Sequence, residues 1–170
     1  MSGTPGVIPA GKKDYTIVAV WQNKGANSDN NYQIIFNQMD TAAKCDGNYA
    51  GMKLEIQRFI SWGCGDSGNG DFSGGGFNLK TPYISITRKN KHLAANNSDI
   101  YFNGQKFTDT KDTVKELSSD VIYIGKYSTG NRFKGYISEI IVFDRALADY
   151  EITAIQQYLS SKYGIGIKLR

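Results

Sequence analysis

Short apolar runs with a repeat of two residues limit this chain to an all-β fold. The runs at residues 83–89 and 121–127 place apolar side chains at alternate positions, which a β-strand turns toward one face. Residues 15–21, YTIVAVW, are apolar at almost every position, and this predicts a central strand covered on both faces. Turn-rich stretches with glycine, asparagine and aspartate separate the runs, so we expect many short strands in a sandwich or barrel.

The longest alternating run covers residues 52–62, MKLEIQRFISW. The period of two assigns five apolar residues of this run to one face of a strand, with Phe59 as the exception. The five are Met52, Leu54, Ile56, Ile60 and Trp62.

A hairpin is predicted at residues 100–107, IYFNGQKF. Asn103 and Gly104 tolerate the positive φ angles of a type I′ turn. A two-residue turn at this point places Phe102 opposite Gln105.

One segment, residues 149–164, has the pattern of a helix. Its apolar residues recur at spacings of three and four, which predicts a stripe that packs against the sheets. Acidic residues at the start, a lysine near the end and Gly164 as a terminator agree with this prediction. The stripe consists of Ile152, Ile155, Leu159 and Tyr163.

Composition and charge exclude several classes of protein. A chain of 170 residues is expected to form one domain with a sizeable core. Twenty basic and sixteen acidic residues are scattered singly, which argues against nucleic acid as a partner. No apolar run approaches the ~20 residues of a membrane span, so we expect no membrane insertion. Residues 1–13 lack the apolar core of a signal peptide; we interpret them as a flexible arm or linker, and residues 14–170 as the domain.

Cys45, Cys64 and His92 are the only cysteines and the only histidine. Three scattered residues are too few for a structural zinc site. The two cysteines either pair in an oxidising compartment or stay as buried thiols, and the sequence leaves both open.

The segment FKGYISEIIVFDRALADYEITAIQQYLSSKYGI, residues 133–165, resembles the C-terminal signature of concanavalin A-like, laminin G-like jelly-roll domains. Ser138 and Ala148 replace the acid and the serine that are common in that signature. The resemblance implies a two-sheet antiparallel jelly-roll sandwich with one short C-terminal helix. The residues that match are Phe133, Gly135, Ile137, Glu139, Ile140, Val142, Phe143, Arg145, Ala146 and Leu147.

Most of this signature has a structural interpretation. Gly135 is expected to permit a bend or a close approach at the start of a strand. Glu139 and Arg145 are expected to form a partly buried ion pair. The alternation assigns Ile137, Ile141 and Phe143 to one face of the strand and Tyr136, Ile140 and Val142 to the other.

The glycine-rich stretch at residues 63–76 begins GCGDSG, which matches two catalytic patterns. A dinucleotide-binding loop requires a helix after its glycines, and the following NGDFSGGGF cannot start one. A serine protease requires a general base for Ser67, and the one histidine, His92, lies in a turn-like polar stretch. We therefore interpret residues 63–76 as a long loop that leaves a strand.

Calcium is a possible ligand of this loop. Asp66, Asn69 and Asp71 provide oxygen ligands among glycines, although the EF-hand spacing fails. Jelly-roll domains that this chain resembles carry irregular calcium sites, which implies a possible calcium ion at Asp66 and Asp71. The alternative is a loop with solvated acids.

A carbohydrate site is predicted from two loops that combine aromatic and polar side chains. Aromatic rings pack against sugar C–H faces, and Asn, Asp and Arg bind hydroxyl groups. The alternative for each aromatic residue is packing in the core. The predicted site residues are Trp62, Asp66, Asn69 and Asp71 in the first loop, and Tyr127, Asn131 and Arg132 in the second.

Hydrolysis is not expected. Retaining glucanases of the similar fold carry Glu-x-Asp-x-x-Glu on one strand, with two carboxylates about 5 Å apart. None of the four glutamates of this chain starts Glu-x-Asp. The sequence thus predicts a non-catalytic module for carbohydrate recognition and adhesion.

The absence of a signal peptide agrees with a virion protein that lysis releases. Domains of this kind occur in phage tail fibres, spikes and capsid decorations, so we expect a location on the virion or extracellular surface. Other virion subunits or a homo-oligomer are then possible partners. Two alternatives stay open: a structural virion domain without a sugar site, and an ancillary binding module of a secreted bacterial enzyme.

Overall fold

The computed structural model describes residues 7–9, 14–25, 32–39, 50–55, 58–62, 71–90, 98–109, 121–126 and 131–169. Ten strands and one helix lie in this part of the chain. Strands β10, β1, β6, β7 and β8 form sheet A in that order, and β5, β4, β3, β2 and β9 form sheet B. The elements are β1 (Tyr15–Asn23), β2 (Tyr32–Met39), β3 (Ala50–Glu55), β4 (Arg58–Trp62), β5 (Asp71–Gly76), β6 (Pro82–Lys89), β7 (Ser98–Phe102), β8 (Gln105–Asp109), β9 (Val121–Ile124), β10 (Gly135–Phe143) and α1 (Asp149–Tyr163).

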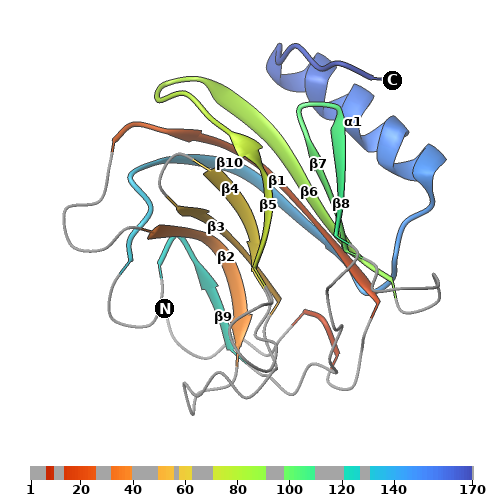
Figure 1. Cartoon of the computed structure of the whole chain (residues 1–170), viewed down its shortest axis with the longest axis horizontal. Coiled ribbons are helices and arrows are strands. Elements are labelled where there is room, and N and C mark those ends of the chain that lie inside the picture. Colours follow the sequence, from red (N-terminus) through yellow and green to blue (C-terminus); the bar gives the residue numbers. More distant parts are fainter. Residues whose placement is uncertain are drawn as a thin grey trace.

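The two sheets pack face to face, and α1 covers the face of sheet A that points away from sheet B (Figure 1). All neighbouring strands are antiparallel. This arrangement confirms the predicted antiparallel sandwich with one C-terminal helix.

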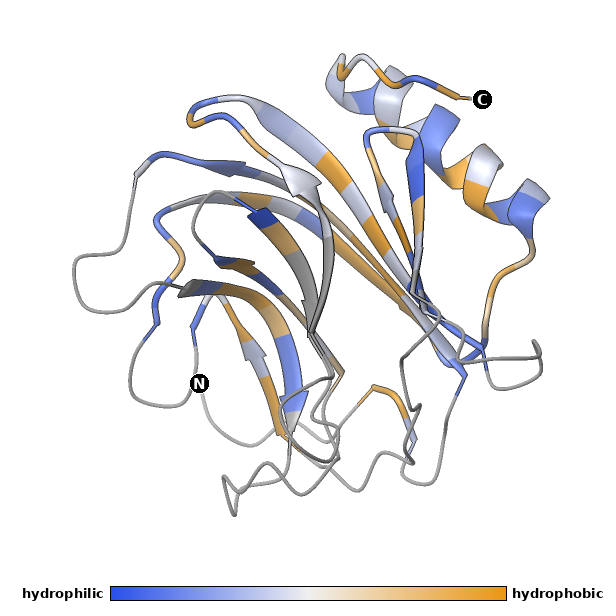
Figure 2. Ribbon diagram, in the orientation of Figure 1, coloured by the Kyte–Doolittle hydropathy of each residue, from blue (hydrophilic) through white to orange (hydrophobic). Residues whose placement is uncertain are grey.

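Strand β1 contributes to two cores at once. Ile17, Ala19 and Trp21 lie in the core between the sheets, while Val18 and Val20 lie in the core under α1. In Figure 2 the hydrophobic colour accordingly runs through the middle of β1, whereas β6 alternates between hydrophobic and paler or hydrophilic segments. The continuous apolar run in the sequence therefore predicted a strand covered on both faces correctly.

Trp21 is the centre of an aromatic cluster between the sheets. Its side chain is 1% exposed. Its ring stacks on the Tyr83 ring with 5.0 Å between the ring centroids, and it packs edge-to-face with the Phe77 ring at a centroid distance of 5.4 Å. The indole Nε1–H donates a hydrogen bond of 2.9 Å to Ser85 Oγ. The buried polar atom of the indole is thus satisfied.

The predicted hairpin forms between β7 and β8. Asn103 has a φ of 44° and Gly104 a φ of 89°, and Phe102 lies opposite Gln105. The segment after α1 crosses this turn, where Lys168 N–H donates to the Asn103 carbonyl at 3.0 Å. A Cβ at Gly104 would collide with the Lys168 backbone, so two constraints require glycine there.

The predicted helix is α1. It ends before Gly164, whose left-handed φ of 63° is typical of a helix terminator. Ile152 and Leu159 of the predicted stripe are buried against sheet A, whereas Gln156 between them is a buried polar residue.

The run at residues 52–62 is two strands, not one. The chain reverses between Glu55 and Arg58, which pair with each other, and Leu54 lies opposite Phe59. Both Leu54 and Phe59 are buried between the sheets. The reversal shifts the alternation, which explains why Phe59 did not fit a single strand.

The stretch at residues 63–76 was wrongly interpreted as a loop throughout, because residues 71–76 form the edge strand β5. Glycine has low strand propensity, which hid this strand from the pattern. A Cβ at Gly74 would collide with the Ile100 side chain across the core. Close approach of the two sheets thus requires glycine in β5.

The predicted faces of β10 are wrong for Ile137. The register between β1 and β10 shifts at Val20 and Trp21 so that Ser138 is an extra residue. This β-bulge turns Ile137 toward the core between the sheets, with Ile140 and Val142, while later residues keep the alternation.

The predicted close approach at Gly135 gives a test of the fold. A Cβ there would collide with the Gln22 carbonyl oxygen of β1, so we expect Gly135→Ala to lower the free energy of unfolding by about 1–3 kcal/mol. Urea denaturation measures this change. Gly166→Ala is the control, because no described atom lies within 4 Å of a Cβ at that position; equal losses in both variants would contradict the steric explanation.

Candidate functional site

Five strand termini meet at one end of sheet B. Met39 at the end of β2 pairs with Val121 at the start of β9, and Gln38, the residue before Met39, pairs with Ala50 at the start of β3. Trp62 at the end of β4 pairs with Asp71 at the start of β5. We call this end, with its termini at Met39, Ala50, Trp62, Asp71 and Val121, the loop end of sheet B. The connections at residues 40–49, 63–70 and 110–120 join the chain there, and they lie outside the described residues.

The strand register brings two predicted site residues together. Trp62 ends β4 and Asp71 begins β5, and they are direct Cα partners across the two strands. Asp66 and Asn69 belong to the connection between them, and Tyr127 follows β9; these three lie outside the described residues.

Asn131 and Arg132 lie elsewhere on sheet B. The Asn131 carbonyl accepts a hydrogen bond of 3.1 Å from Ile34 N–H of β2. Trp62 is level with Gly51 and Asn37. Neighbouring strands are ~4.8 Å apart, so the three strand spacings between Trp62 and Asn131 amount to about 14 Å across the sheet. Ile34 is three residues from Asn37 on β2, which adds about 10 Å along the strands at ~3.4 Å per residue.

The environments of these two residues differ. Asn131 is 6% exposed and has a φ of 51°, a conformation that asparagine tolerates better than most residues. Arg132 is exposed. The backbone of Asn131 therefore has a structural role beside β2, and its contribution to a sugar site stays a prediction.

The calcium prediction is also open. Among the described residues, no group of three or more His, Cys, Asp or Glu side chains is placed to hold a metal ion. Asp66, one of the two predicted ligands, lies outside the described residues. Cys45 and Cys64 also lie outside the described residues.

No helix in the described part of the chain is long and apolar enough to cross a membrane.

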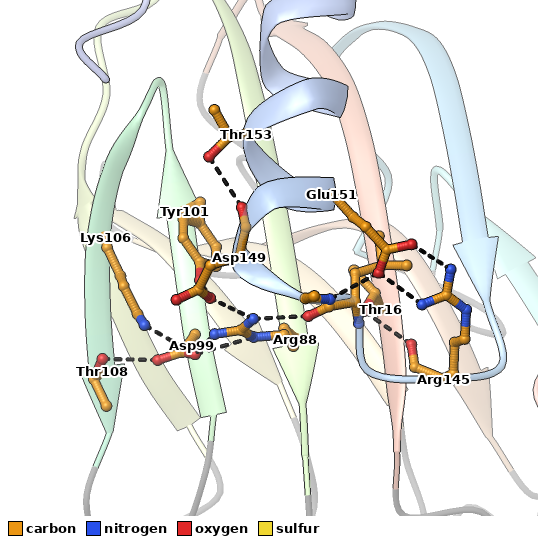
Figure 3. Close-up of polar contacts among 12 residues, drawn as sticks. Thr16, Arg88, Asp99, Tyr101, Lys106, Thr108, Arg145, Asp149, Glu151 and Thr153 are labelled. Atoms are coloured by element: carbon orange, nitrogen blue, oxygen red, sulfur yellow. Dashed lines mark hydrogen bonds and ion pairs between the residues drawn. The ribbon is translucent and has the colours of Figure 1, made fainter. Parts of the chain in front are cut away.

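The predicted ion pair between Glu139 and Arg145 is wrong. Arg145 instead makes two hydrogen bonds, of 2.8 and 2.6 Å, to the carboxylate of Glu151 in the first turn of α1 (Figure 3). Glu139 accepts hydrogen bonds of 3.0 Å from Lys162 and Tyr163 at the other end of α1. Arg145 lies four residues before the start of α1 and six before Glu151, so the two-pronged geometry to Glu151 is available locally.

A cluster of charged residues lies where α1 begins, on the outer face of sheet A (Figure 3). The Arg88 side chain is 5% exposed. Its Nη1 donates to Asp149 Oδ1 at 2.6 Å and to the Leu147 carbonyl at 2.7 Å, and its Nε and Nη2 donate to Asp99 Oδ2. One guanidinium thus joins β6, β7 and the start of α1.

Further side chains complete this Arg88 cluster, which consists of Arg88, Asp99, Tyr101, Lys106 and Asp149. The Tyr101 hydroxyl donates to Asp149 Oδ1 at 3.1 Å, and Lys106 Nζ lies 3.4 Å from Asp99 Oδ2. Burial raises the pKa of Tyr101, so the hydroxyl stays protonated. Burial also opposes ionisation of Asp149, but the hydrogen bond and charge of Arg88 outweigh it and lower the pKa of Asp149.

A cavity of about 650 Å³ lies beside the cluster at the start of α1. Its lining includes three basic residues and two acidic ones: Arg88, Lys106, Arg145, Asp149 and Glu151. Each basic residue already pairs with a carboxylate. The cluster therefore fastens α1 to sheet A, and it does not present unbalanced charge to a ligand.

Sequence reasoning missed the Arg88 cluster. A signal was available, because Arg88 and Asp99 are charged residues at the ends of two apolar runs. They are direct partners between β6 and β7, where opposite charges stabilise a strand pair. Only the register shows that they meet.

The fold and its C-terminal signature define a lectin-like β-sandwich. The chain belongs to the concanavalin A-like lectin/glucanases superfamily, whose family model matches residues 4–153. The comparison with curated proteins found no significant match to the chain.

Solved structures of sialidases contain a similar sandwich. Trypanosoma rangeli sialidase in complex with sialic acid has a TM-score of 0.64 at 16% identity, over 91% of this chain and 24% of that chain. The NanB sialidase from Streptococcus pneumoniae has a TM-score of 0.62 at 17% identity, over 84% of this chain and 24% of that chain. The chain therefore spans about a quarter of these sialidases, and at this identity the likeness shows the fold alone.

The role of Arg88 can be tested by substitution. Arg88→Met leaves Asp99 buried with Lys106 as its remaining cationic partner, so we expect the free energy of unfolding to fall by about 3–5 kcal/mol. Arg145→Met, which removes an exposed pair, is the control and should lower the free energy of unfolding much less. Chemical denaturation compares the two variants, and a similar small loss in both would contradict the anchoring role of Arg88.

The pair between Arg145 and Glu151 predicts a dependence on pH. The hydrogen bonds from Arg145 and then from Ala148 N–H lower the pKa of Glu151 to about 2. The pKa of an unfolded glutamate is about 4.3. The stabilisation is therefore complete above that pH and is lost as the pH falls toward about 2.

The test compares the free energy of unfolding of the native protein with that of Glu151→Gln across pH. We expect the difference to shrink from about pH 5 toward about pH 2. A difference that stays constant over this range would show that the charge of Glu151 contributes nothing.

Proposed function

We propose that this domain is a non-catalytic carbohydrate-binding module whose sugar site is at the loop end of sheet B. The observation that carries the proposal is the pairing of Trp62 with Asp71 at the end of sheet B where five strand termini lie. An indole offers an apolar face to the C–H surface of a sugar ring, and a carboxylate accepts hydrogen bonds from hydroxyl groups. Asp66 and Asn69, in the connection between the two strands, add polar groups to the same end.

The comparisons support binding as the activity. The superfamily includes lectins and glucanases. About three quarters of the similar sialidase chains lie outside the match, so their hydrolytic activity does not transfer to this chain. The absence of the Glu-x-Asp-x-x-Glu pattern points in the same direction.

Calcium is proposed as a cofactor of this site, held by Asp66 and Asp71. Asp71 begins β5 at the loop end, and Asp66 precedes it by five residues, in the connection that leads into β5. Carboxylate oxygens are the ligands that calcium prefers. An ion there would also fix the connection against the strand ends.

The biological setting that we propose is adhesion from a virion surface, in a tail fibre, spike or capsid decoration. A purely structural domain of a virion is the alternative without a sugar site. The similarity to one portion of larger sialidases favours a further candidate, an ancillary binding module beside an enzyme.

Glycan-array binding with and without a calcium chelator tests the proposal. We expect binding to a defined group of glycans that weakens at least about tenfold, or about 1.4 kcal/mol, in Trp62→Ala and in Asp71→Asn. The chelator should have a similar effect on the native protein. Tyr158→Ala and Asp144→Asn, at exposed positions far along the chain from β4 and β5, are the matched controls.

Three outcomes would contradict parts of the proposal. Lack of binding to every glycan, with or without calcium, would leave a structural domain. Binding that survives both substitutions would place the sugar site elsewhere. Binding that the chelator leaves unchanged would remove calcium from the site.

A further inference from the structure

A second cavity lies on the opposite side of sheet A from sheet B, between α1 and the β7–β8 hairpin. Its volume is about 270 Å³, just below the ~300 Å³ at which pockets for drug-sized ligands begin. Tyr101 and Gln156 are buried in its wall, while Gln105, Lys106 and Leu169 on its rim are exposed. The cavity therefore has a covered interior and an accessible mouth.

Gln156 is an unusual residue for its position in α1. It lies between Ile152 and Leu159 in the row that the helix buries against sheet A, and it is 2% exposed. Its Oε1 accepts no hydrogen bond from any residue that the structure describes. A buried acceptor without a donor is costly, and a leucine would pack at this point without that cost. The Oε1 atom itself has almost no accessible surface, so the amide is explained if it turns toward the cavity and a ligand there supplies the donor.

The other polar groups of the cavity have complementary roles. The Asp149 carboxylate accepts side-chain hydrogen bonds from two described residues, Arg88 and Tyr101, and both reach Oδ1. The second oxygen, Oδ2, can therefore accept a hydrogen bond from a ligand. Lys106 supplies N–H donors, and its Nζ lies 5.6 Å from the centroid of the Tyr101 ring. Gln156 and Asp149 thus bring two acceptors and Lys106 a donor to the side of the Tyr101 ring, and Gln105 and Thr153 add further polar groups to the lining.

The charges around the cavity indicate a neutral ligand. Lys106 and the neighbouring Arg88 are balanced by Asp99 and Asp149. An anion would meet the carboxylate of Asp149, and a cation would meet the ammonium of Lys106. Hydroxyl groups both donate and accept hydrogen bonds, so a compound with several hydroxyls satisfies Gln156, Asp149 and Lys106 together.

We propose that this cavity binds a small neutral polyhydroxy compound, of the size of one sugar ring or a cyclic polyol, through Gln156, Asp149 and Lys106. This second site is separate from the loop end of sheet B and does not depend on the function proposed there. It lies under α1, whereas the first site lies at the ends of the strands of the other sheet.

Amide chemical shifts in ¹⁵N-labelled protein provide the test, with D-galactose and myo-inositol as neutral probes. We expect saturable shifts at millimolar concentration, confined to residues 101–106, 149–156 and 165–169. D-galacturonate and D-galactosamine, which carry a negative and a positive charge, are the matched probes and should bind more weakly.

Gln156→Leu removes the acceptor and keeps the size of the side chain, so we expect affinity for the neutral probes to fall about five- to tenfold. Its thermal midpoint should stay equal or rise, since the buried row of α1 becomes fully apolar. Gln157→Leu, at the exposed neighbouring position, is the control and should leave the affinity unchanged.

The proposal is overturned if neutral probes cause no shifts in these segments, if a charged probe binds as tightly, or if Gln156→Leu keeps the native affinity. Trp62→Ala separates the two sites. If this variant abolishes the shifts, the probes bind at the loop end, which contradicts the second site and supports the first. If it leaves the shifts intact while glycan binding is lost, both sites are supported.

Discussion

Strand β1 is the element on which the sandwich depends, because it is buried on both faces. One set of its alternate side chains fills the space between the sheets, and the other set fills the space under α1. It also pairs with β10 on one edge and with β6 on the other. The hydrophobic free energy of both cores therefore draws on the apolar side chains of this one strand.

The elements that could be predicted are those that local rules decide. The turn at Asn103 and Gly104 and the end of α1 at Gly164 follow from positive φ angles, and the apolar run of β1 follows from burial on both faces. The failures came from contacts between distant segments. Strand β5 depends on the space beside Ile100 that Gly74 leaves open, and no property of a glycine-rich stretch shows this in advance.

The same difference holds for the polar residues. Arg145 was expected to reach Glu139, but the helix that follows presents Glu151 nearer, and Glu139 turns to the far end of α1. For the candidate site, residue types indicated sugar recognition, while only the register shows that Trp62 and Asp71 are neighbours. A shared fold hosts both binding and catalytic proteins, so the function depends on such particular groups.

The burial of Trp21 has a consequence for spectroscopy. Its indole is enclosed by aromatic rings and makes its hydrogen bond to Ser85, so its fluorescence reports the polarity of the core and changes when the sheets separate. The chain contains one other tryptophan, Trp62 at the loop end. A change in emission that leaves the core intact is therefore assigned to Trp62, and the unmodified protein carries separate optical probes for folding and for events at the ends of sheet B.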